Sequence, residues 1–384
     1  MKKRYYLDHN ATTPIRPEVL DAMIPYMKEI YGNPSSVHWY GQAAKNALEM
    51  SREKIAAIIG ADAEEVFFTG CGTESDNIAL TGYMNAIQNR NGLVTTKVEH
   101  SAILKTAAQL EKKGVDVTYI GVDNQCVINL DELSNAVSAN TALVSIMHAN
   151  NETGVLQPIK EAAKIAHDAG AVFHTDAVQS TGKIHIDVRE MDIDMLSMSA
   201  HKINAPKGVG AIYIKKGIDI EPLTYGGSHE RGIRPGTENV AGIVGLTKAL
   251  ELYTKEREER ALRLSILRDR LETAIEKNIP NILFNGRDVL RLPGTSNISF
   301  PDVDGEALLF SMDLEGAAVS TGSACTTGEV EPSHVLIAMG IMPNVAQSSI
   351  RFSLGWGNTE EDIDHVITVL PSIIQRLRKI SGRN

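Results

Sequence analysis

Five short apolar runs along the chain each end in a cluster of polar residues whose types could do chemistry. The clusters are Gly70-Cys-Gly-Thr-Glu-Ser-Asp76, Glu99-His-Ser101, Ala149-Asn-Asn-Glu-Thr-Gly154, Asp176-Ala-Val-Gln179 and Ser199-Ala-His-Lys202. Taken singly, each has an ordinary structural explanation, since Asn-Asn pairs favour turns and a lone lysine is usually solvated. In an open parallel sheet, however, ligands bind outside the carboxyl ends of the strands. Five polar clusters at five such ends favour a binding site at one edge of a sheet.

The chemistry that fits this set is that of pyridoxal phosphate, which needs a phosphate cradle, a carboxylate and a lysine. Lys202 could hold the cofactor as a Schiff base, and Asp176 could keep the pyridine nitrogen protonated so that the ring accepts electrons. Ser199 and His201 could add a hydroxyl and an imidazole to the phosphate site. His100 could stack on the ring or move protons near pH 7.

The turn that contains Gly72 and Thr73 is the candidate phosphate cradle. A glycine-rich turn that leads into a helix offers free backbone N–H groups and the positive end of the helix dipole. The signal is weak alone. Thr73 or Ser75 could instead be a plain N-cap for a helix over Asn77–Gln88, with Asp76 in its first turn.

The segment Ser320-Thr-Gly-Ser-Ala-Cys325-Thr-Thr-Gly places a cysteine among small residues. Because none of these neighbours supplies apolar packing, Cys325 is expected on an exposed, mobile loop, which suits a reactive thiol. Cys126 and Cys71 are interpreted instead as buried and inert. Arg351, in Ser348-Ser-Ile-Arg-Phe, could bind a substrate carboxylate through two hydrogen bonds, although alone it would be interpreted as a surface ion pair.

Alternating helix and strand patterns between about residues 15 and 255 must position these groups. Strands alternating with helices such as Ile159–Asp168 predict βαβ units and a mostly parallel sheet. A helix opened by Pro14 and Pro17 repeats apolar residues at three- and four-residue steps, namely Val19, Met23, Tyr26, Met27 and Ile30. The predicted strands are Glu65–Thr69, Leu93–Val98, Ala142–His148, Ala171–Thr175, Met195–Met198 and Gly210–Ile214.

A different pattern begins near Tyr253. Lys255–Lys277 is rich in charge, which predicts a solvated helix that packs one face on a second domain. Its apolar stripe is predicted to be Leu262, Ile266, Leu267, Leu271 and Ile275. A strand (Thr295–Phe300) and two helices (Gly305–Asp313, Ile363–Arg378) follow. We therefore expect an α/β protein. A large domain at 15–255 would hold the cofactor, and a smaller α+β domain of residues 1–14 and 256–384 would carry the Cys325 loop.

Composition and charge exclude several classes of function. The 38 basic residues against 48 acidic ones give a net charge of −10, which opposes binding to nucleic acids or anionic membranes. Aromatic residues are only 5% of the chain, too few to favour stacking on nucleic-acid bases. Three scattered cysteines predict neither a disulfide framework nor a zinc site. With no signal peptide and no apolar run long enough to span a membrane, a cytoplasmic protein is expected.

Over nearly its whole length the chain resembles the NifS/IscS-type cysteine desulfurases, which are pyridoxal-phosphate enzymes of fold type I (class V aminotransferase-like). The resemblance rests on Tyr6-Leu-Asp-His-Asn-Ala-Thr-Thr, Tyr31-Gly-Asn-Pro-Ser-Ser-Val-His, Val98-Glu-His, His148-Ala-Asn-Asn-Glu-Thr-Gly, His174-Thr-Asp-Ala-Val-Gln, Ser199-Ala-His-Lys, Gly236-Thr-Glu-Asn and Ser320-Thr-Gly-Ser-Ala-Cys. Together these motifs are very specific.

The resemblance implies a cofactor role for most of the polar clusters. Lys202 would carry pyridoxal phosphate, Asp176 would face the pyridine nitrogen and Gln179 would bond the ring hydroxyl. His100 would stack over the ring. The phosphate would be held by Gly72, Thr73, Ser199 and His201, with Thr237 from the other subunit of a homodimer.

The same resemblance implies the reaction, in which sulfur is removed from L-cysteine to give L-alanine and a persulfide on Cys325. Asn151, beside the cofactor, and Arg351 would orient the substrate. The sulfur would pass to an iron–sulfur scaffold protein or to another acceptor, such as a carrier for tRNA thiolation. No resident metal is expected, although Cys325 could ligate an iron–sulfur cluster transiently. A selenocysteine lyase, another class V aminotransferase-like enzyme and a non-catalytic scaffold on the same fold are the alternatives.

Overall fold

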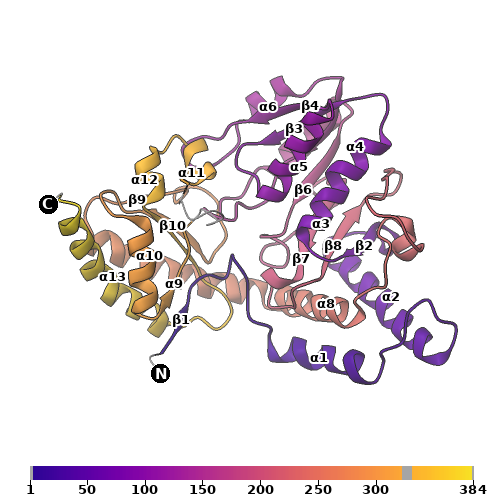
Figure 1. Cartoon of the computed structure of the whole chain (residues 1–384), viewed down its shortest axis with the longest axis horizontal. Coiled ribbons are helices and arrows are strands. Elements are labelled where there is room, and N and C mark those ends of the chain that lie inside the picture. Colours follow the sequence, from indigo (N-terminus) through magenta and orange to yellow (C-terminus); the bar gives the residue numbers. More distant parts are fainter. Residues whose placement is uncertain (1–2, 322–330, 383–384) are drawn as a thin grey trace.

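The computed structural model describes residues 3–321 and 331–382, and within them the chain folds into two lobes (Figure 1). The larger lobe contains a seven-stranded sheet, and the smaller one contains a three-stranded sheet with long helices. This is the α/β architecture that the sequence predicts. No helix in the described part of the chain is long and apolar enough to cross a membrane.

The large sheet has the strand order β2-β8-β7-β6-β5-β3-β4. Only β8 runs antiparallel to its neighbours, so the sheet is mostly parallel. Six strands match the predicted ones within three residues, whereas the half-exposed edge strand β4 escaped prediction. The strands are β2 (Val66–Thr69), β3 (Gly92–Thr96), β4 (Asp116–Ile120), β5 (Thr141–Ser145), β6 (Val172–Asp176), β7 (Met195–Ser199) and β8 (Gly210–Ile214).

Helices cover both faces of this sheet and form two apolar cores. Because side chains alternate along a strand, Phe68 of β2 enters one core and its neighbour Phe67 enters the other. The first core contains α1 (Pro17–Lys28), α2 (Trp39–Ile59), α7 (Ile159–Asp168) and α8 (Val240–Lys255). The second contains α5 (Ser101–Lys112) and the continuous helical segment of α3 (Gly72–Asn77), the π-helical η2 (Ile78–Gly82) and α4 (Tyr83–Ala86). The short α6 (Leu130–Ala136) packs on α7.

Two sequence predictions about these helices are corrected by the structure. The helix expected over Asn77–Gln88 begins at Gly72, so Thr73 and Ser75 lie inside it and neither is its N-cap. In α1, Val19 and Met23 are buried as expected, but Met27 is exposed.

The smaller lobe is built on the antiparallel sheet β12-β10-β9, with bounds Ser349–Ser353, Thr295–Ser299 and Leu283–Phe284. Helices α9 (Arg257–Asn278), α10 (Gly305–Leu314) and α13 (Glu360–Ile380) pack around its core. The pair β1 (Tyr5–Tyr6) and β11 (Ala317–Ala318) and the short helices α11 (His334–Ala338) and α12 (Pro343–Gln347) complete the lobe. Three 3-10 turns lie in the larger lobe, namely η1 (Ala63–Glu65), η3 (Ala200–Lys202) and η4 (His229–Gly232).

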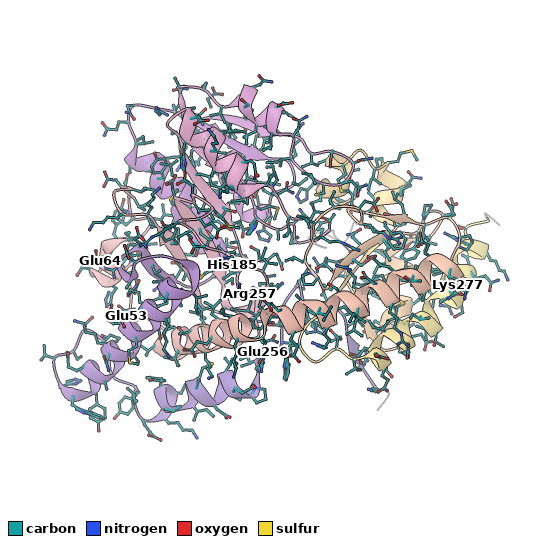
Figure 2. All side chains as sticks on the ribbon, turned by 180° about the vertical axis from the view of Figure 1, so that it is seen from behind. Glu53, Glu64, His185, Glu256, Arg257 and Lys277 are labelled. Atoms are coloured by element: carbon teal, nitrogen blue, oxygen red, sulfur yellow. The ribbon has the colours of Figure 1, made fainter. Side chains whose placement is uncertain are left out.

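Helix α9 runs along the smaller lobe from its junction with the larger one. Figure 2 shows Arg257 beside His185 at the start of this helix and Lys277 near its far end. Its buried stripe is Leu264, Leu267, Leu271 and Ile275, spaced by three, four and four residues. The predicted stripe was therefore partly wrong, because Leu262 and Ile266 are exposed.

The N-terminal segment links the two lobes. Tyr5 and Tyr6 pair in parallel with Ala317 and Ala318, so this end of the chain belongs to the smaller lobe. A few residues later, Thr13 donates its hydroxyl to the backbone oxygen of His201 in the larger lobe at 2.8 Å. The residues in between include Asn10 and Ala11, whose backbone oxygens accept hydrogen bonds from Lys202, just after β7.

Candidate active site

A cavity of about 410 Å³ lies where the carboxyl ends of the large sheet meet the smaller lobe and the N-terminal segment. Its walls include backbone and side chains from both lobes. Of the twelve predicted site residues, ten line it: Gly72, Thr73, His100, Asn151, Asp176, Gln179, Ser199, His201, Lys202 and Arg351. Residues more than 270 positions apart in the sequence thus share one cavity.

Strand ends explain why these side chains converge. Asp176 is the last residue of β6, and Ser199 is the last residue of β7. The 3-10 turn after β7 brings Lys202 back towards the same edge. Gly72 begins α3 just after β2, which runs parallel to β7 because both are antiparallel to β8.

The first turn of α3 has the features of an anion cradle. A Cβ atom on Gly72 would lie 2.6 Å from Cγ2 of Val178, so a larger residue here would force Val178 to shift. The Ser199 hydroxyl is buried and has no hydrogen-bond partner among the described residues. The first N–H groups of a helix also lack partners within the helix. These unpaired donors fit a phosphate group, which accepts several hydrogen bonds.

His201 stands beside this cradle as a neutral imidazole. Its Nδ1 lies 3.1 Å from the Thr12 hydroxyl. Burial lowers the pKa of His201 to about 4, and the nearby charges of Lys202 and Lys207 act in the same direction. A neutral imidazole can donate one N–H to an anion.

Asp176 is buried, and its Oδ1 accepts the backbone N–H of Val178 at 2.9 Å. Burial raises its pKa, while the positive ends of His100 and Lys202 oppose the rise. A second carboxyl group stands close by, because Asp76, His100 and Asp176 each place a ligating atom within 4.8 Å of the others. Burial and the charge of Asp176 raise the pKa of Asp76 well above its usual value. Asp176 is therefore the member of the pair that ionises more readily.

Lys202 is an amine that releases its proton readily. Its Nζ donates to the backbone oxygens of Asn10 at 2.6 Å and Ala11 at 2.9 Å. Burial lowers its pKa to about 8. The positive charge of Arg351 lowers the pKa further, whereas the negative charge of Asp176 raises it. Because the neutral amine is the nucleophile, this environment favours attack on an aldehyde near neutral pH.

His100 is fixed in orientation as the N-cap of α5. Its Nδ1 accepts the backbone N–H of Ala102 at 3.1 Å, so in the neutral ring the proton sits on Nε2. Burial lowers the pKa of His100, with Asp176 opposing this effect and Lys202 reinforcing it. The ring lines the cavity and can exchange a proton at Nε2.

Arg351 is not the surface ion pair that it would be interpreted as in isolation. Its side chain is 7% exposed, and its Nη1 donates to the backbone oxygen of Asn151 at 2.9 Å. The other nitrogen, Nη2, pairs with Oδ1 of Asp8 at 2.7 Å. The guanidinium is thus buried at the cavity wall, in a position to meet a carboxylate.

The remaining two predicted site residues are Thr237 and Cys325. Thr237 is exposed and is not among the residues that line it. Cys325 lies outside the described residues. Among the other cysteines, Cys126 is buried as expected and burial raises its pKa to about 12. Cys71 was expected to be buried, but it is half-buried and lines the cavity.

Sequence reasoning missed several residues that line the cavity. Asn10 and Ala11 supply the carbonyls that Lys202 contacts, although their motif was noted without a role. Asp76 was interpreted only as a residue of the first helical turn, yet it lies at the cavity wall. Its position directly after a glycine-rich strand end was the available signal.

Similarities to known proteins agree with this geometry. The family model of the class-V aminotransferases matches residues 5–366. The cysteine desulfurase IscS of Dictyoglomus turgidum is 49% identical over 382 residues, which cover 99% of this chain and 97% of that protein.

Two solved structures are also similar. A NifS-like protein has a TM-score of 0.92 at 39% identity, covering 97% of this chain and 100% of its own. A structure described as SspA in complex with cysteine has a TM-score of 0.82 at 36% identity, covering 91% and 98%. The chain belongs to the class-V aminotransferase family, and within it to the NifS/IscS-type cysteine desulfurases.

Proposed function

We propose that this enzyme removes sulfur from L-cysteine, giving L-alanine and a persulfide on Cys325. The observation that carries the proposal is the convergence of Lys202, Asp176 and Arg351 on one cavity. These residues supply an amine of lowered pKa, a buried carboxylate and a carboxylate-binding guanidinium. The relative SspA, whose structure is described as a complex with cysteine, supports cysteine as the substrate class.

The cofactor proposed for this cavity is pyridoxal phosphate. The residues of the cavity fit this cofactor. Lys202 would hold the aldehyde carbon of the cofactor, and Asp176 would contact its ring nitrogen. Its phosphate would meet Gly72, Thr73, Ser199 and His201, of which the Ser199 hydroxyl has no other partner among the described residues. Gln179 would meet its ring hydroxyl. When bound, the cofactor supplies a cationic ring that stabilises negative charge on the substrate α-carbon.

The chain's own residues would then perform the proton and sulfur transfers. Arg351 and Asn151 bind and orient the substrate carboxylate, and Lys202 takes the α-proton on its neutral amine. His100 moves a proton to or from sulfur at Nε2. The thiolate of Cys325 attacks the substrate sulfur, so that one C–S bond breaks as one S–S bond forms. Cysteine and the Cys325 thiol thus yield alanine and the Cys325 persulfide, with no other oxidant or reductant.

The assembly and surroundings of the enzyme are proposals of the same kind. We propose a homodimer in which Thr237 reaches the partner's phosphate site, because in its own chain this residue is exposed away from the cavity. The division into domains of residues 15–255 and of 1–14 with 256–384 is supported by the separate apolar core of the smaller lobe, to which Leu7 belongs.

The acceptor of the sulfur and the location of the enzyme are further proposals. A scaffold protein for iron–sulfur clusters is the proposed acceptor, and the cytoplasm is the expected location.

The experiment that tests the cofactor assignment is the mapping of the modified lysine. The purified protein is reduced with borohydride and digested, and its peptides are analysed by mass spectrometry. We expect the mass of reduced pyridoxal phosphate on Lys202 alone and no visible absorption band in Lys202→Ala. Modification of a different lysine, or of none, would contradict the proposal.

A further inference from the structure

A second lysine, Lys183, lies behind the candidate site in the connection between β6 and β7. Its Nζ donates to Oε1 of Gln179 at 3.0 Å. Lys183 is half-buried, yet among the described residues it forms no ion pair with a carboxylate, and the charges that act on it are those of cations. A partly buried cation without an anionic partner is unfavourable unless a hydrogen bond compensates for the lost water. The hydrogen bond to Gln179 is the contact that compensates Lys183 for lost water.

The Gln179 amide is held from both ends. While Oε1 accepts from Lys183, Nε2 donates to the backbone oxygen of Asn10 at 2.9 Å. That same oxygen accepts the Nζ of Lys202 at 2.6 Å. A chain of hydrogen bonds thus runs from Lys183 through Gln179 and Asn10 to Lys202. The backbone oxygen of Asn10 can only accept a hydrogen bond, and the ammonium group of Lys183 can only donate one. Both contacts therefore fit the same one of the two orientations of the Gln179 amide.

The surroundings of Lys183 are positively charged. It lines a small cavity of about 30 Å³ together with Lys202, Arg260 and His9. Arg260 is occupied by the backbone oxygens of Tyr253 and Gly182, and burial lowers the pKa of His9 to about 4. Burial lowers the pKa of Lys183 to about 7, with further lowering from the charges of Lys202, Arg260 and Arg351. A neutral amine still has N–H donors, so the bond to Gln179 survives loss of the charge.

We propose that Lys183 is a positioning residue of the active site, which acts through Gln179 by holding its amide with the NH2 end towards Asn10 and the cofactor cavity. The inference rests on the proposed function, in which Gln179 meets the ring hydroxyl of pyridoxal phosphate. One N–H of Nε2 is used by Asn10, and the second remains for the ring oxygen. If the amide flipped, its carbonyl oxygen would face that ring oxygen and repel it.

The consequence is a defined electronic state of the bound ring before any substrate arrives. A donor at the ring oxygen favours its anionic form, whereas an acceptor there favours the protonated form. The two forms absorb at different wavelengths, so the absorption spectrum of the substrate-free enzyme reports which end of Gln179 faces the cofactor.

The test compares Lys183→Met, which keeps most of the unbranched side chain but not the donor, with Lys183→Arg, which keeps both donor and charge. Lys164→Met is the matched control, because Lys164 is exposed and pairs with Asp168 within α7. For each protein we would record the substrate-free spectrum from acid to alkaline pH, the affinity for pyridoxal phosphate and the thermal midpoint.

We expect Lys183→Met to shift the spectrum towards the form with a protonated ring oxygen and to weaken cofactor binding by roughly three- to tenfold, the loss of one hydrogen bond. Lys183→Arg should restore the wild-type spectrum, and Lys164→Met should match wild type. A Lys183→Met spectrum and pH titration equal to wild type, or a Lys183→Arg spectrum equal to that of Lys183→Met, would overturn the inference. If instead wild type shows no band that Lys202→Ala abolishes, the proposed function itself fails.

Discussion

Arg351 and Asp8 lie 343 positions apart in the sequence, yet their side chains form an ion pair of 2.7 Å at the wall of the candidate active site. Asp8 comes from the N-terminal segment and Arg351 from β12 of the smaller lobe. Both side chains are largely shielded from water. Asp8 therefore holds the guanidinium in place, while the Asn151 carbonyl on its other nitrogen fixes its plane.

Replacing Arg351 with lysine should impair substrate binding more than folding. Lysine keeps the charge but cannot make the paired hydrogen bonds of a guanidinium, so we expect the KM for L-cysteine to rise by roughly tenfold or more. Steady-state kinetics with a thermal melt measures both effects. Arg270→Lys is the control, since Arg270 is an exposed arginine that pairs with Glu360. An unchanged KM in Arg351→Lys would refute the substrate-binding role.

Replacing Asp176 with asparagine should leave the cofactor bound but slow the reaction. The amide cannot balance a cationic ring nitrogen, so we expect kcat to fall by roughly a hundredfold or more, as when a key charge-stabilising group is removed. The visible band and kcat are measured on the same sample, with the surface variant Asp168→Asn as control. A kcat close to that of wild type would show that Asp176 does not face the ring nitrogen.

Loading of the cofactor should depend on pH through Lys202. Only the neutral amine attacks the aldehyde, and the pKa of Lys202 is lowered to about 8. The rate at which the cofactor-free protein takes up pyridoxal phosphate should therefore rise with pH and reach its midpoint near 8. Stopped-flow absorbance gives this profile. A midpoint near 10.5, the ordinary value for lysine, would mean that the cavity does not perturb this amine.

Glu99 should make the stability of the folded protein depend on pH. It is fully buried, and burial raises its pKa from 4.5 to about 8. Between these values the folded protein keeps the proton that the unfolded chain has released, so stability falls as pH rises from about 4.5 towards 8. Oε1 already accepts from Thr96 and Met147, whereas Oε2 has no partner among the described residues.

The variant Glu99→Gln cannot ionise and should escape this loss. The difference between its thermal midpoint and that of wild type should grow in favour of the variant as the pH rises from 5 to 8. Thermal melts followed by circular dichroism measure this difference. A difference that stays constant over this range would show that Glu99 does not hold its proton in the folded state.

The strand ends and the residues that follow them could be predicted because their signals are local. A short apolar run followed by Asp176, or by Ser199 and Lys202, shows both the strand and its polar end. The edge strand β4 lacked this signal, since its exposed and half-buried residues alternate and only its last residue, Ile120, is buried. The same local reasoning placed Leu262 and Ile266 on the buried face of α9, because charged residues surround both faces of that helix.

The contacts between distant segments could not be predicted from local patterns. The backbone oxygens of Asn10 and Ala11 reach Lys202 from a segment that is held at one end by the pairing of β1 with β11 and at the other by the hydrogen bond from Thr13 to His201. Lys183 carried no signal, since a lone lysine in a turn is usually solvated. Its role depends on the Gln179 amide and on the cations behind it, which only the folded chain brings together.

The central claim, that sulfur leaves L-cysteine by way of Cys325, is tested most directly by one comparison. Wild type and Cys325→Ala, each loaded with pyridoxal phosphate, receive L-cysteine under reductant while the absorption spectrum and the alanine formed are measured together. We predict a spectral shift in both proteins but sustained alanine formation only in wild type. Full alanine formation by Cys325→Ala would contradict the claim and favour a lyase that acts without this thiol, and a band that cysteine leaves unchanged would favour an aminotransferase with another substrate.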